Sequence, residues 1–396
     1  MKYAILVGDG MADFPAPELD NRTPLEHATT PNMDRVAARG RVGLVRTIPD
    51  GLPAGSDVAN LSLLGYDPAA HYQGRAPIEA ASMGVALGPS DTAFRCNLVT
   101  IQDGIMADYS AGHIDTAAAQ AIVADLQKEL SSDSVRFHPG VSYRHLAVIA
   151  DLPQGTCTCT PPHAISGKQV RPYMPAGAGD RVILDLMQRA KAVLARSAAN
   201  LERAAAGKPP VTDIWLWGQG RAVRLPSLRE RYGLTGSVIS AVDLVRGLGV
   251  LAGMTVRIVP GATGYLGTNY AGKVAAAREA LQSEDLVYLH VEAPDETSHE
   301  GSLDKKIQAI EEFDRHIVGG VLGLFGEHPD LRLLVLPDHA TPVSLKDHHA
   351  MPVPFAVCGA GIVADASTAY SEKAAAGRRT LTGVSLFAEF VRGTFA

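Results

Sequence analysis

Cysteine is scarce in this chain, and its placement argues against a disulfide-stabilised or zinc-knuckle protein. Only four cysteines occur among 396 residues. Cys157 and Cys159 are one residue apart, which does not match the two-residue spacing of a CxxC metal or redox motif. We therefore expect reduced cysteines that serve in packing, as is usual in the cytoplasm.

Long apolar runs and a strong charge of one sign are also missing. No stretch reaches the roughly 18 uninterrupted apolar residues of a membrane span. The first apolar run is too short for a secretory signal. The net charge is −6, which indicates neither a nucleic-acid nor an anionic membrane partner. We expect a cytoplasmic protein with a small-molecule substrate, and the sequence predicts no particular oligomeric state.

The length and the order of the expected elements predict two domains. A chain of 396 residues exceeds one typical core of roughly 100–200 residues. From residue 237 onward, helices alternate with continuous apolar strands, which predicts a mostly parallel sheet between helices. Residues 87–230 lack that alternation, as in a separate α+β domain. Because the strand at residues 3–7 needs the same sheet, we expect residues 1–86 and 231–396 to form one α/β core.

Hydrophobic periodicity and turn residues place the individual elements. A loop rich in Pro and Gly over residues 48–56 is expected to lead into a helix over residues 57–64. Further helices are expected at residues 31–39, 116–130, 182–205, 237–252, 270–281 and 303–325. Further strands are expected at residues 93–101, 143–149, 255–258, 286–291, 331–336 and 353–357.

Carboxylates and imidazoles gather at the ends of the expected core strands, where open α/β sheets bind ligands. The residues concerned are Asp9, Asp295, His299, Asp338, His339, Asp347, His348 and His349. Any one such pair is more often a helix cap or a surface turn than a ligand set. Four of them at one sheet edge favour a metal site, because burying so many is costly unless cations neutralise them. Mixed Asp/His ligation suits Mn²⁺ or Zn²⁺ better than Ca²⁺.

Ser56 is the candidate nucleophile. It stands just before an expected helix, whose N-terminus could receive a phosphate on the hydroxyl. A metal beside that hydroxyl would favour its alkoxide. The alternative is that Ser56 only caps the helix. From these residues alone, capping is the more common role.

Several segments together resemble the archaeal-type, 2,3-bisphosphoglycerate-independent phosphoglycerate mutases of the alkaline phosphatase superfamily. The matching segments are LVGDGMAD, TPLEHATTPNMD, GSDVANLSLLGYDP, YQGRAPIEA, FRCNL, DETSH, PDH and the final HxxxPVP. The resemblance runs nearly from end to end. It implies an alkaline-phosphatase-like core, residues 1–86 and 231–396, with an inserted substrate-binding cap domain, residues 87–230.

The resemblance also implies residue roles. Ser56 would carry the phosphate. One metal would be held by Asp9, Ser56, Asp338 and His339, and the other by Asp295, His299 and His348. His348 is preferred to His349 because the family's histidine lies four residues before the proline of PVP, here Pro352. Phosphate would move from 3-phosphoglycerate to Ser56 and back to the 2-hydroxyl of glycerate. Two divalent ions would assist, Mn²⁺ or Zn²⁺ or else Mg²⁺.

The substrate side departs from the family pattern. Archaeal-type mutases carry DRRAGR where this chain has DYSAGH at residues 108–113, and RGAG where it has WGQG at residues 217–220. The loss of arginines argues for a smaller or zwitterionic acceptor, since phosphoglycerate favours bidentate guanidinium contacts. The expected substrate-binding residues are Arg75, Arg95, Asp108, His113, Lys168 and Arg171.

These departures leave an alternative open. A bacterial branch of the family, proposed to act as homoserine kinases, is similar in its DYSAGH and WLWG segments. Homoserine carries an ammonium group beside its carboxylate, so fewer arginines would bind it. This alternative keeps Ser56 and both metals and changes the donor and the acceptor. A plain phosphatase and a non-catalytic binding protein are further alternatives. We predict the mutase reaction because the whole-chain resemblance and the metal motifs favour it.

Overall fold

The computed structural model describes residues 1–153 and 157–395. Across this described part of the chain, no helix combines the length and the apolar character needed to cross a membrane. The chain divides into two compact units. Unit 1 comprises Met1–Tyr72 and Arg224–Ala396, and unit 2 comprises Gln73–Val223.

The boundaries of the units differ in position from those expected. The predicted core and cap domains divide after residues 86 and 230, whereas the two compact units divide after residues 72 and 223. Helix α5 (Ala76–Ser82) packs on strands of unit 2. An amphipathic helix belongs to the unit against which it buries its apolar face. Because α5 packs on unit 2, the first boundary precedes α5.

An eight-stranded sheet forms the centre of unit 1, in the order β11-β10-β12-β1-β13-β14-β2-β15. Strand β1 pairs in parallel with β12 and β13, and β14 is antiparallel to β13 and β2. The predicted mostly parallel α/β sheet is confirmed. The strands are β1 (Lys2–Gly8), β2 (Gly40–Arg46), β10 (Gly236–Ile239), β11 (Thr255–Val256), β12 (Leu286–Val291), β13 (Leu331–Leu336), β14 (Val353–Gly359) and β15 (Thr380–Thr382).

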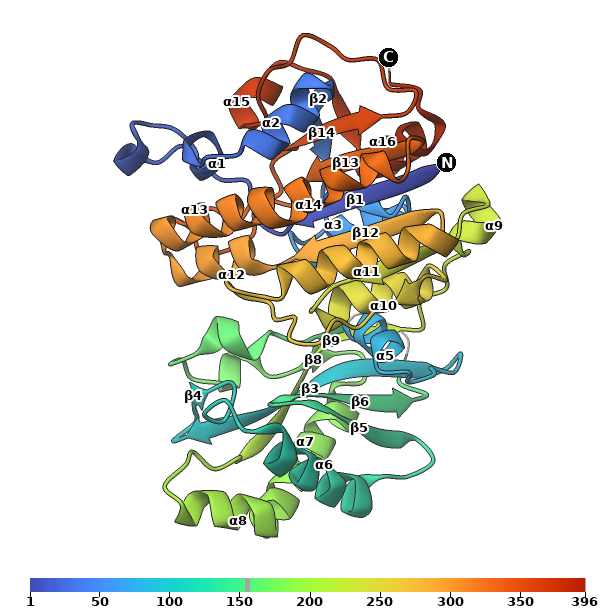
Figure 1. Cartoon of the computed structure of the whole chain (residues 1–396). Helices are drawn as coiled ribbons and strands as arrows, with labels where there is room; N and C mark the ends of the chain where they lie inside the picture. Colours follow the sequence, from blue (N-terminus) through green and yellow to red (C-terminus); the bar gives the residue numbers. More distant parts are fainter. Residues whose placement is uncertain (154–156, 396) are drawn as a thin grey trace. The chain divides into compact units, whose positions relative to one another are not determined.

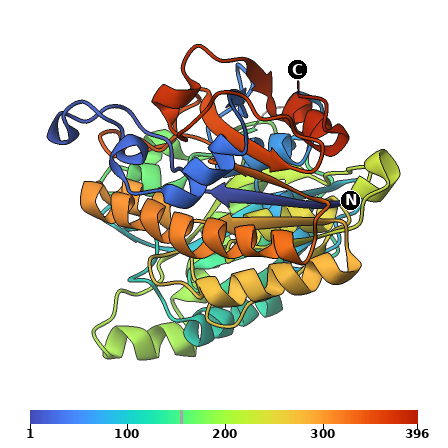
Figure 2. The ribbon, with the colours of Figure 1, turned by 45° about the horizontal axis from the view of Figure 1, so that its top comes forward.

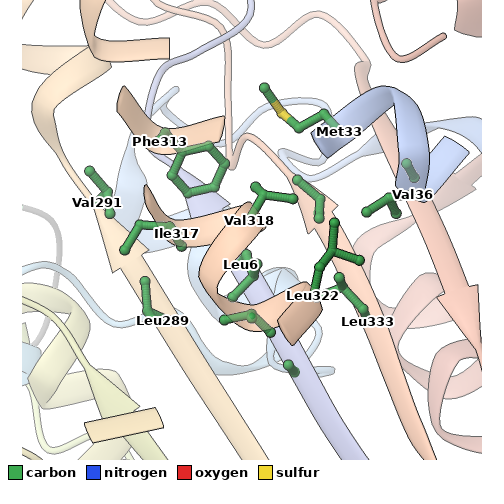
Figure 3. Close-up of a cluster of buried hydrophobic side chains, with 14 of the residues drawn as sticks. Leu6, Met33, Val36, Leu289, Val291, Phe313, Ile317, Val318, Leu322 and Leu333 are labelled. Carbon is green, nitrogen blue, oxygen red and sulfur yellow. The ribbon is translucent and has the colours of Figure 1, made fainter. Parts of the chain in front are cut away.

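One face of this sheet carries a helical layer. Leu6, Leu289 and Leu333 of the central strands lie in a buried cluster with Phe313 and Val318 (Figure 3). The helices of this layer are α2 (Pro31–Ala38), α11 (Tyr270–Ser283), α13 (Leu303–Glu312), the π-helical η4 (Phe313–Val318) and α14 (Gly319–Leu322). In both ribbon views α11 and α13 lie alongside these strands (Figures 1 and 2).

The alternate residues of the same strands face a second layer. Tyr3 of β1 packs edge-on against Phe390 of α16 (Gly383–Arg392) with ring centroids 5.6 Å apart. Tyr288 of β12 donates a hydrogen bond to Asn60 of α3 (Ser56–Leu63). Helix α3 also contacts α16 and α10 (Asp243–Leu251). The sheet is thus covered on both faces, which is why its strands are apolar throughout.

The remaining short helices of unit 1 lie at its connections. They are η1 (Pro17–Leu19), α1 (Pro24–His27), α4 (Pro68–His71), α9 (Leu228–Tyr232), α12 (Ala293–Glu300), η5 (Gly323–Gly326) and α15 (Glu372–Ala375).

Two predicted helices differ in the structure. Residues 237–252 begin with strand β10, because buried Val238 and Ile239 pair with β12 and the helical part starts only at Asp243. The apolar pattern of α10 continues into β10, so the predicted helix began too early in the sequence. Residues 182–205 form two helices, and Ser197 begins the second of them as its N-cap residue. The Ser197 side chain makes no capping hydrogen bond.

Unit 2 contains an antiparallel sheet in the order β4-β3-β6-β5, with β9 also paired to β3. Helices α6 and α7 pack on it, and their apolar residues form the core with those of the sheet. The strands are β3 (Asp91–Gln102), β4 (Ile105–Asp108), β5 (Val135–Val141), β6 (Arg144–Ala150) and β9 (Asp213–Arg221). The other elements are α6 (Thr116–Leu130), β7 (Cys157–Thr158), η2 (Pro162–Ile165), η3 (Arg171–Tyr173), β8 (Ala176–Gly177), α7 (Asp180–Leu194) and α8 (Ala198–Ala205).

Candidate metal centre

The carboxyl ends of three adjacent strands, β12, β1 and β13, bring the predicted ligands of unit 1 together. Within each of three groups, the ligand atoms lie within 4.8 Å of one another. All six predicted carboxylate and imidazole ligands enter these groups, together with one histidine that was not predicted. The groups are Asp295, His299 and His348; Asp9, Asp295 and His339; and Asp9, His290 and Asp338.

The first group is centred on helix α12. His299 lies one turn after Asp295, which places both side chains on one face of the helix. Nε2 of His299 is 3.1 Å from Oδ2 of Asp295 and 3.1 Å from Nε2 of His348. Nδ1 of His299 donates to the carbonyl oxygen of Lys346 at 2.9 Å. Two ring nitrogens and a carboxylate therefore converge on one point, where only a proton or a cation can hold them together.

The pKa values of Asp295 and His299 indicate which member of this group attracts a cation. Burial favours the neutral form of Asp295, but its hydrogen bonds to His299 and His348 outweigh burial and hold its pKa well below the usual value. Burial also lowers the pKa of His299, yet the hydrogen bond and charge of Asp295 raise that pKa to about 9. Asp295 thus stabilises positive charge at this position, as a divalent ligand site requires.

The second group surrounds Ser56, the first residue of helix α3. Oγ of Ser56 lies 3.1 Å from Nε2 of His339. Thr341 sets the tautomer of that ring, because its hydroxyl donates to Oδ1 of Asp295 at 2.5 Å and so accepts from Nδ1 of His339 at 3.2 Å. Nε2 of His339 then carries the lone pair. It faces both the Ser56 hydroxyl and, at 3.4 Å, Oδ1 of Asp9.

Asp9 carries the clearest sign of a missing positive partner. Its Oδ1 is buried and has no hydrogen-bond partner among the described residues. Burial, followed by the neighbouring carboxylates of Asp338 and Asp295, raises the pKa of Asp9 well above its usual value. An unsatisfied buried carboxylate oxygen is costly, and a divalent cation beside it would remove that cost. The donor set of the centre therefore fits divalent metal ions.

Asn60, Tyr288 and His290 complete the centre, and none of them was predicted from the sequence. Nδ2 of Asn60 donates to Oδ2 of Asp338 at 2.7 Å and to the carbonyl oxygen of Ser56 at 2.8 Å. Tyr288 donates to Oδ1 of the same amide. One signal in the sequence could have pointed to two of these residues. Tyr288 and His290 stand at alternate positions of the otherwise apolar strand β12.

The other polar residues near the last strand point elsewhere. The ring of His349 packs edge-on against Phe14 with centroids 5.1 Å apart, and its Nδ1 accepts the backbone N–H of Met351. Asp347 accepts the backbone N–H of His348 at 2.8 Å. Of the two adjacent histidines, His348 is the one whose imidazole enters a ligand group.

In unit 2, two of the predicted substrate-binding residues converge on a carboxylate. Nε of Arg75 and Nε of Arg95 each lie 2.9 Å from Glu79. The Arg95 guanidinium also lies 4.2 Å from the centre of the Trp217 ring. Burial favours the neutral form of Glu79, but the charges of Arg95 and Arg75 outweigh it and lower its pKa. Two guanidinium groups against one carboxylate leave this group of residues positively charged.

Asp108 and His113 lie in one loop of unit 2. The Asp108 carboxylate accepts the backbone N–H groups of Ser110 at 2.7 Å and Gly112 at 2.8 Å, so it organises the turn. Burial raises the pKa of Asp108, but the hydrogen bond from the Ser110 hydroxyl and these two backbone bonds outweigh it, so the pKa is lowered. His113 packs edge-on against Tyr143, with ring centroids 6.1 Å apart.

The last two predicted substrate-binding residues lie further along unit 2. Nζ of Lys168 donates to the carbonyl oxygen of Ala164 at 3.1 Å. Arg171 begins η3 and is exposed.

An α/β sheet that gathers aspartates and histidines at its carboxyl edge, beside a serine that begins a helix, has the donor set of a divalent metal site. The family model described as 2,3-bisphosphoglycerate-independent phosphoglycerate mutase matches residues 37–200. A curated mutase of this name from Methanosarcina barkeri is 55% identical over 359 residues, which are 90% of each chain. A probable mutase from Geobacter sulfurreducens is 50% identical over 382 residues, which are 95% of each chain.

Two solved structures extend the comparison. The cofactor-independent phosphoglycerate mutase from Thermoplasma acidophilum matches with a TM-score of 0.66 and 27% identity over 99% of both chains. A protein from Pyrococcus horikoshii matches with a TM-score of 0.82 and 27% identity, over 100% of this chain and 98% of the other. The chain belongs to the 2,3-bisphosphoglycerate-independent phosphoglycerate mutase family, an isomerase family, which confirms the predicted resemblance and enzyme class.

Proposed function

We propose that this chain interconverts 3-phosphoglycerate and 2-phosphoglycerate through a phosphoserine at Ser56. The observation that carries the proposal is the convergence of the Ser56 hydroxyl, Nε2 of His339 and the unsatisfied Oδ1 of Asp9. A nucleophilic hydroxyl and unpaired metal-type donors at one point are what a metal-assisted transfer to serine requires.

Two divalent ions are part of this proposal. One would be held by Asp9, Ser56, Asp338 and His339, and the other by Asp295, His299 and His348. When bound, the two ions would supply positive charge that lowers the pKa of the serine hydroxyl and neutralises the phosphoryl oxygens. Mn²⁺ and Zn²⁺ suit this mixture of carboxylate and imidazole donors.

Ser56 is held in place for transfer by the chain itself. It is the first residue of α3, so the helix N-terminus favours negative charge close to its Oγ. Its hydroxyl donates to Nε2 of His339, and its carbonyl oxygen is fixed by Asn60. A side chain already oriented in this way loses little conformational entropy on reaction.

The reaction balances without any external phosphate. The bond between phosphorus and the 3-oxygen of the substrate breaks as the bond to Oγ of Ser56 forms, and the serine proton passes to the 3-oxygen. The 2-hydroxyl of glycerate then takes the phosphoryl group, and its proton returns to Oγ. Each step exchanges one P–O bond for another, and no cofactor is consumed.

The substrate in this proposal is a small phosphorylated acid, which fits a cytoplasmic location. We propose that the positively charged group around Glu79 in unit 2 binds one of its anionic groups, because an anion there would balance the excess guanidinium charge. The candidate substrate-side residues remain Arg75, Arg95, Asp108, His113, Lys168 and Arg171.

The test uses the full chain, stripped of metal by a chelator and then reloaded with Mn²⁺ or Zn²⁺. After incubation with 3-phosphoglycerate, 2-phosphoglycerate should appear in the ³¹P NMR spectrum only with the reloaded protein. The same protein is incubated separately with homoserine and ATP. O-phosphohomoserine without any 2-phosphoglycerate would overturn the mutase proposal.

The homoserine kinase alternative is supported by one specific feature of unit 2. Aromatic rings occupy the segments where arginines of the family pattern are missing. The His163 ring lies edge-on to Trp217 with centroids 5.4 Å apart and to Tyr109 with centroids 6.2 Å apart. Ring faces attract ammonium groups, and homoserine has an ammonium group whereas phosphoglycerate has none.

A further inference from the structure

His290 is a fully buried histidine that stands outside both predicted ligand sets. It lies on β12 at 0% exposure. Its Nε2 is 2.9 Å from Oδ2 of Asp9, and its Nδ1 is 3.2 Å from Oγ of Ser240. The ring therefore bridges the end of β10 and the carboxylate that follows β1.

The tautomer of His290 follows from its two partners, the carboxylate of Asp9 at Nε2 and the hydroxyl of Ser240 at Nδ1. Oγ of Ser240 accepts the backbone N–H of Val242 at 3.0 Å. The single hydroxyl hydrogen of Ser240 is then free to be donated to Nδ1 of His290. Nδ1 is the acceptor, so the ring hydrogen sits on Nε2 and is donated to Oδ2 of Asp9. The opposite tautomer would set a bare nitrogen against a carboxylate oxygen.

The backbone around this bridge fixes its position. In the parallel pairing of β1 with β12, Val7 lies opposite His290, so Asp9 follows the strand pair directly. The carbonyl oxygen of His290 accepts a hydrogen bond from Nζ of the buried Lys273 at 2.8 Å. A side chain on a central strand with its backbone anchored in this way can hold a neighbour to a fraction of an ångström.

The two oxygens of Asp9 consequently have different environments. Oδ2 is taken by the Nε2–H of His290, whereas Oδ1 is buried without a hydrogen-bond partner among the described residues. Oδ1 is also the oxygen that faces Nε2 of His339. Oδ1 is thus the oxygen of the carboxylate that remains available, on the side of His339.

We propose that the Ser240–His290 pair is a positioning relay that makes Asp9 a single-oxygen metal ligand by occupying its Oδ2. This inference rests on the proposed function, since it concerns the metal that Asp9 would hold. His290 belongs to a ligand group with Asp9 and Asp338, but both of its ring nitrogens are taken, by Asp9 and by Ser240. In this proposal it therefore acts through Asp9. Outer partners of this kind usually matter by roughly 10–100-fold in metal affinity.

The experiment measures metal binding directly. The full chain is stripped of metal, and MnCl₂ is titrated by calorimetry and by the electron paramagnetic resonance signal of free Mn²⁺. The wild-type chain should show two binding events. His290→Leu should weaken one event by about 10–100-fold and leave the other, at Asp295, His299 and His348, unchanged.

Two gentler variants separate positioning from simple loss of packing. His290→Gln places an amide N–H near the position of Nε2, so it should recover most of the lost affinity. Ser240→Ala removes the hydrogen bond that fixes the tautomer, so it should weaken the same event by less than His290→Leu does. Both variants keep the test decisive if His290→Leu does not fold.

His328→Leu is the matched control, because His328 precedes β13 at the opposite end of the sheet from Asp338. It should leave both events as in the wild type. The relay is overturned if His290→Leu or Ser240→Ala binds as the wild type does, or if His290→Gln is as weak as His290→Leu. A wild-type chain that binds no Mn²⁺ or Zn²⁺ would overturn the proposed function itself.

Discussion

Each unit contains a group of charged side chains, and the two groups differ in sign. In unit 1, Asp9, Asp295 and Asp338 lie together, and one oxygen of Asp9 has no hydrogen-bond partner among the described residues. In unit 2, a single carboxylate, Glu79, lies between two guanidinium groups. The first arrangement attracts cations and the second attracts anions.

The two groups also differ in what holds them. The carboxylates of unit 1 follow adjacent parallel strands, and neutral donors from β12 and α3 fix their orientation. The arginines of unit 2 are fixed by their own ion pairs with Glu79. We therefore expect substitutions in unit 1 to remove activity or fold, and those in unit 2 to change substrate affinity.

Removal of the nucleophile should have the largest effect. Ser56→Ala should lower kcat by at least about 10⁴-fold, because loss of a covalent nucleophile leaves only binding and electrostatic terms. The fold and the metal content should stay close to those of the wild type, since the other three proposed ligands of that ion, Asp9, Asp338 and His339, remain. Enzyme assay, metal analysis and circular dichroism test this. Substantial residual turnover would remove Ser56 from this role.

Loss of a buried charge beside the metal centre should have the next largest effect. Lys306 is 0% exposed, and its Nζ lies 2.8 Å from Asp13 and 2.9 Å from the carbonyl oxygen of Thr341. Lys306→Met leaves Asp13 buried without its partner, so the free energy of unfolding in urea should fall by about 3–5 kcal/mol.

The adjacent lysine offers a matched control for that prediction. Lys305 forms an exposed pair with Glu300, and exposed pairs contribute little to stability. Lys305→Met should therefore unfold at nearly the wild-type urea concentration. Equal losses of unfolding free energy in the two variants would show that the buried Lys306–Asp13 pair contributes no more to stability than the exposed pair does.

A pH-dependent effect of intermediate size is expected at Glu372, which accepts hydrogen bonds from Thr23 and from the backbone of Asp13. Burial raises the pKa of Glu372 to about 7 from an ordinary value of 4.5. The folded protein then binds a proton more tightly than the unfolded chain does. The stabilising contribution is complete below about pH 4.5 and is lost as the pH rises through about 7.

Glu372→Gln should remove this contribution to the pH dependence. Relative to the wild type, the variant should gain about 1–3 kcal/mol of unfolding free energy between pH 4.5 and pH 7, because its amide keeps the neutral form at every pH. Urea titrations at several pH values measure the difference. A difference that stays constant with pH would contradict the prediction.

The smallest effect is expected in unit 2. Arg95→Lys keeps the positive charge but loses the planar guanidinium that lies over Trp217 and bonds Glu79. The KM for 3-phosphoglycerate should rise by about 10-fold, or about 1.4 kcal/mol, with kcat nearly unchanged. Arg196→Lys, in an exposed pair with Glu129, is the control and should behave as the wild type. A loss confined to kcat would contradict a binding role for Arg95.

The sequence by itself determined the ordered α/β pattern of the core and the residue types at its edge. The predicted strands at residues 286–291 and 331–336 coincide with β12 and β13. Short apolar runs bounded by turn residues are typical of buried strands. The motifs also indicated the family, which the relatives confirm. The strand at residues 236–239 was missed, since its apolar pattern merges with that of the following helix.

Tertiary structure alone decided which polar groups meet. His290 and Asp9 are 281 positions apart in the sequence, and Tyr288 and Asn60 are 228 apart. Their hydrogen bonds depend on the order and register of strands and on how α3 packs over them. The tautomers of His290 and His339 depend in turn on Ser240 and Thr341. Local sequence carries no information on such partners, because burial and the direction of each donor arise only when the sheet is assembled.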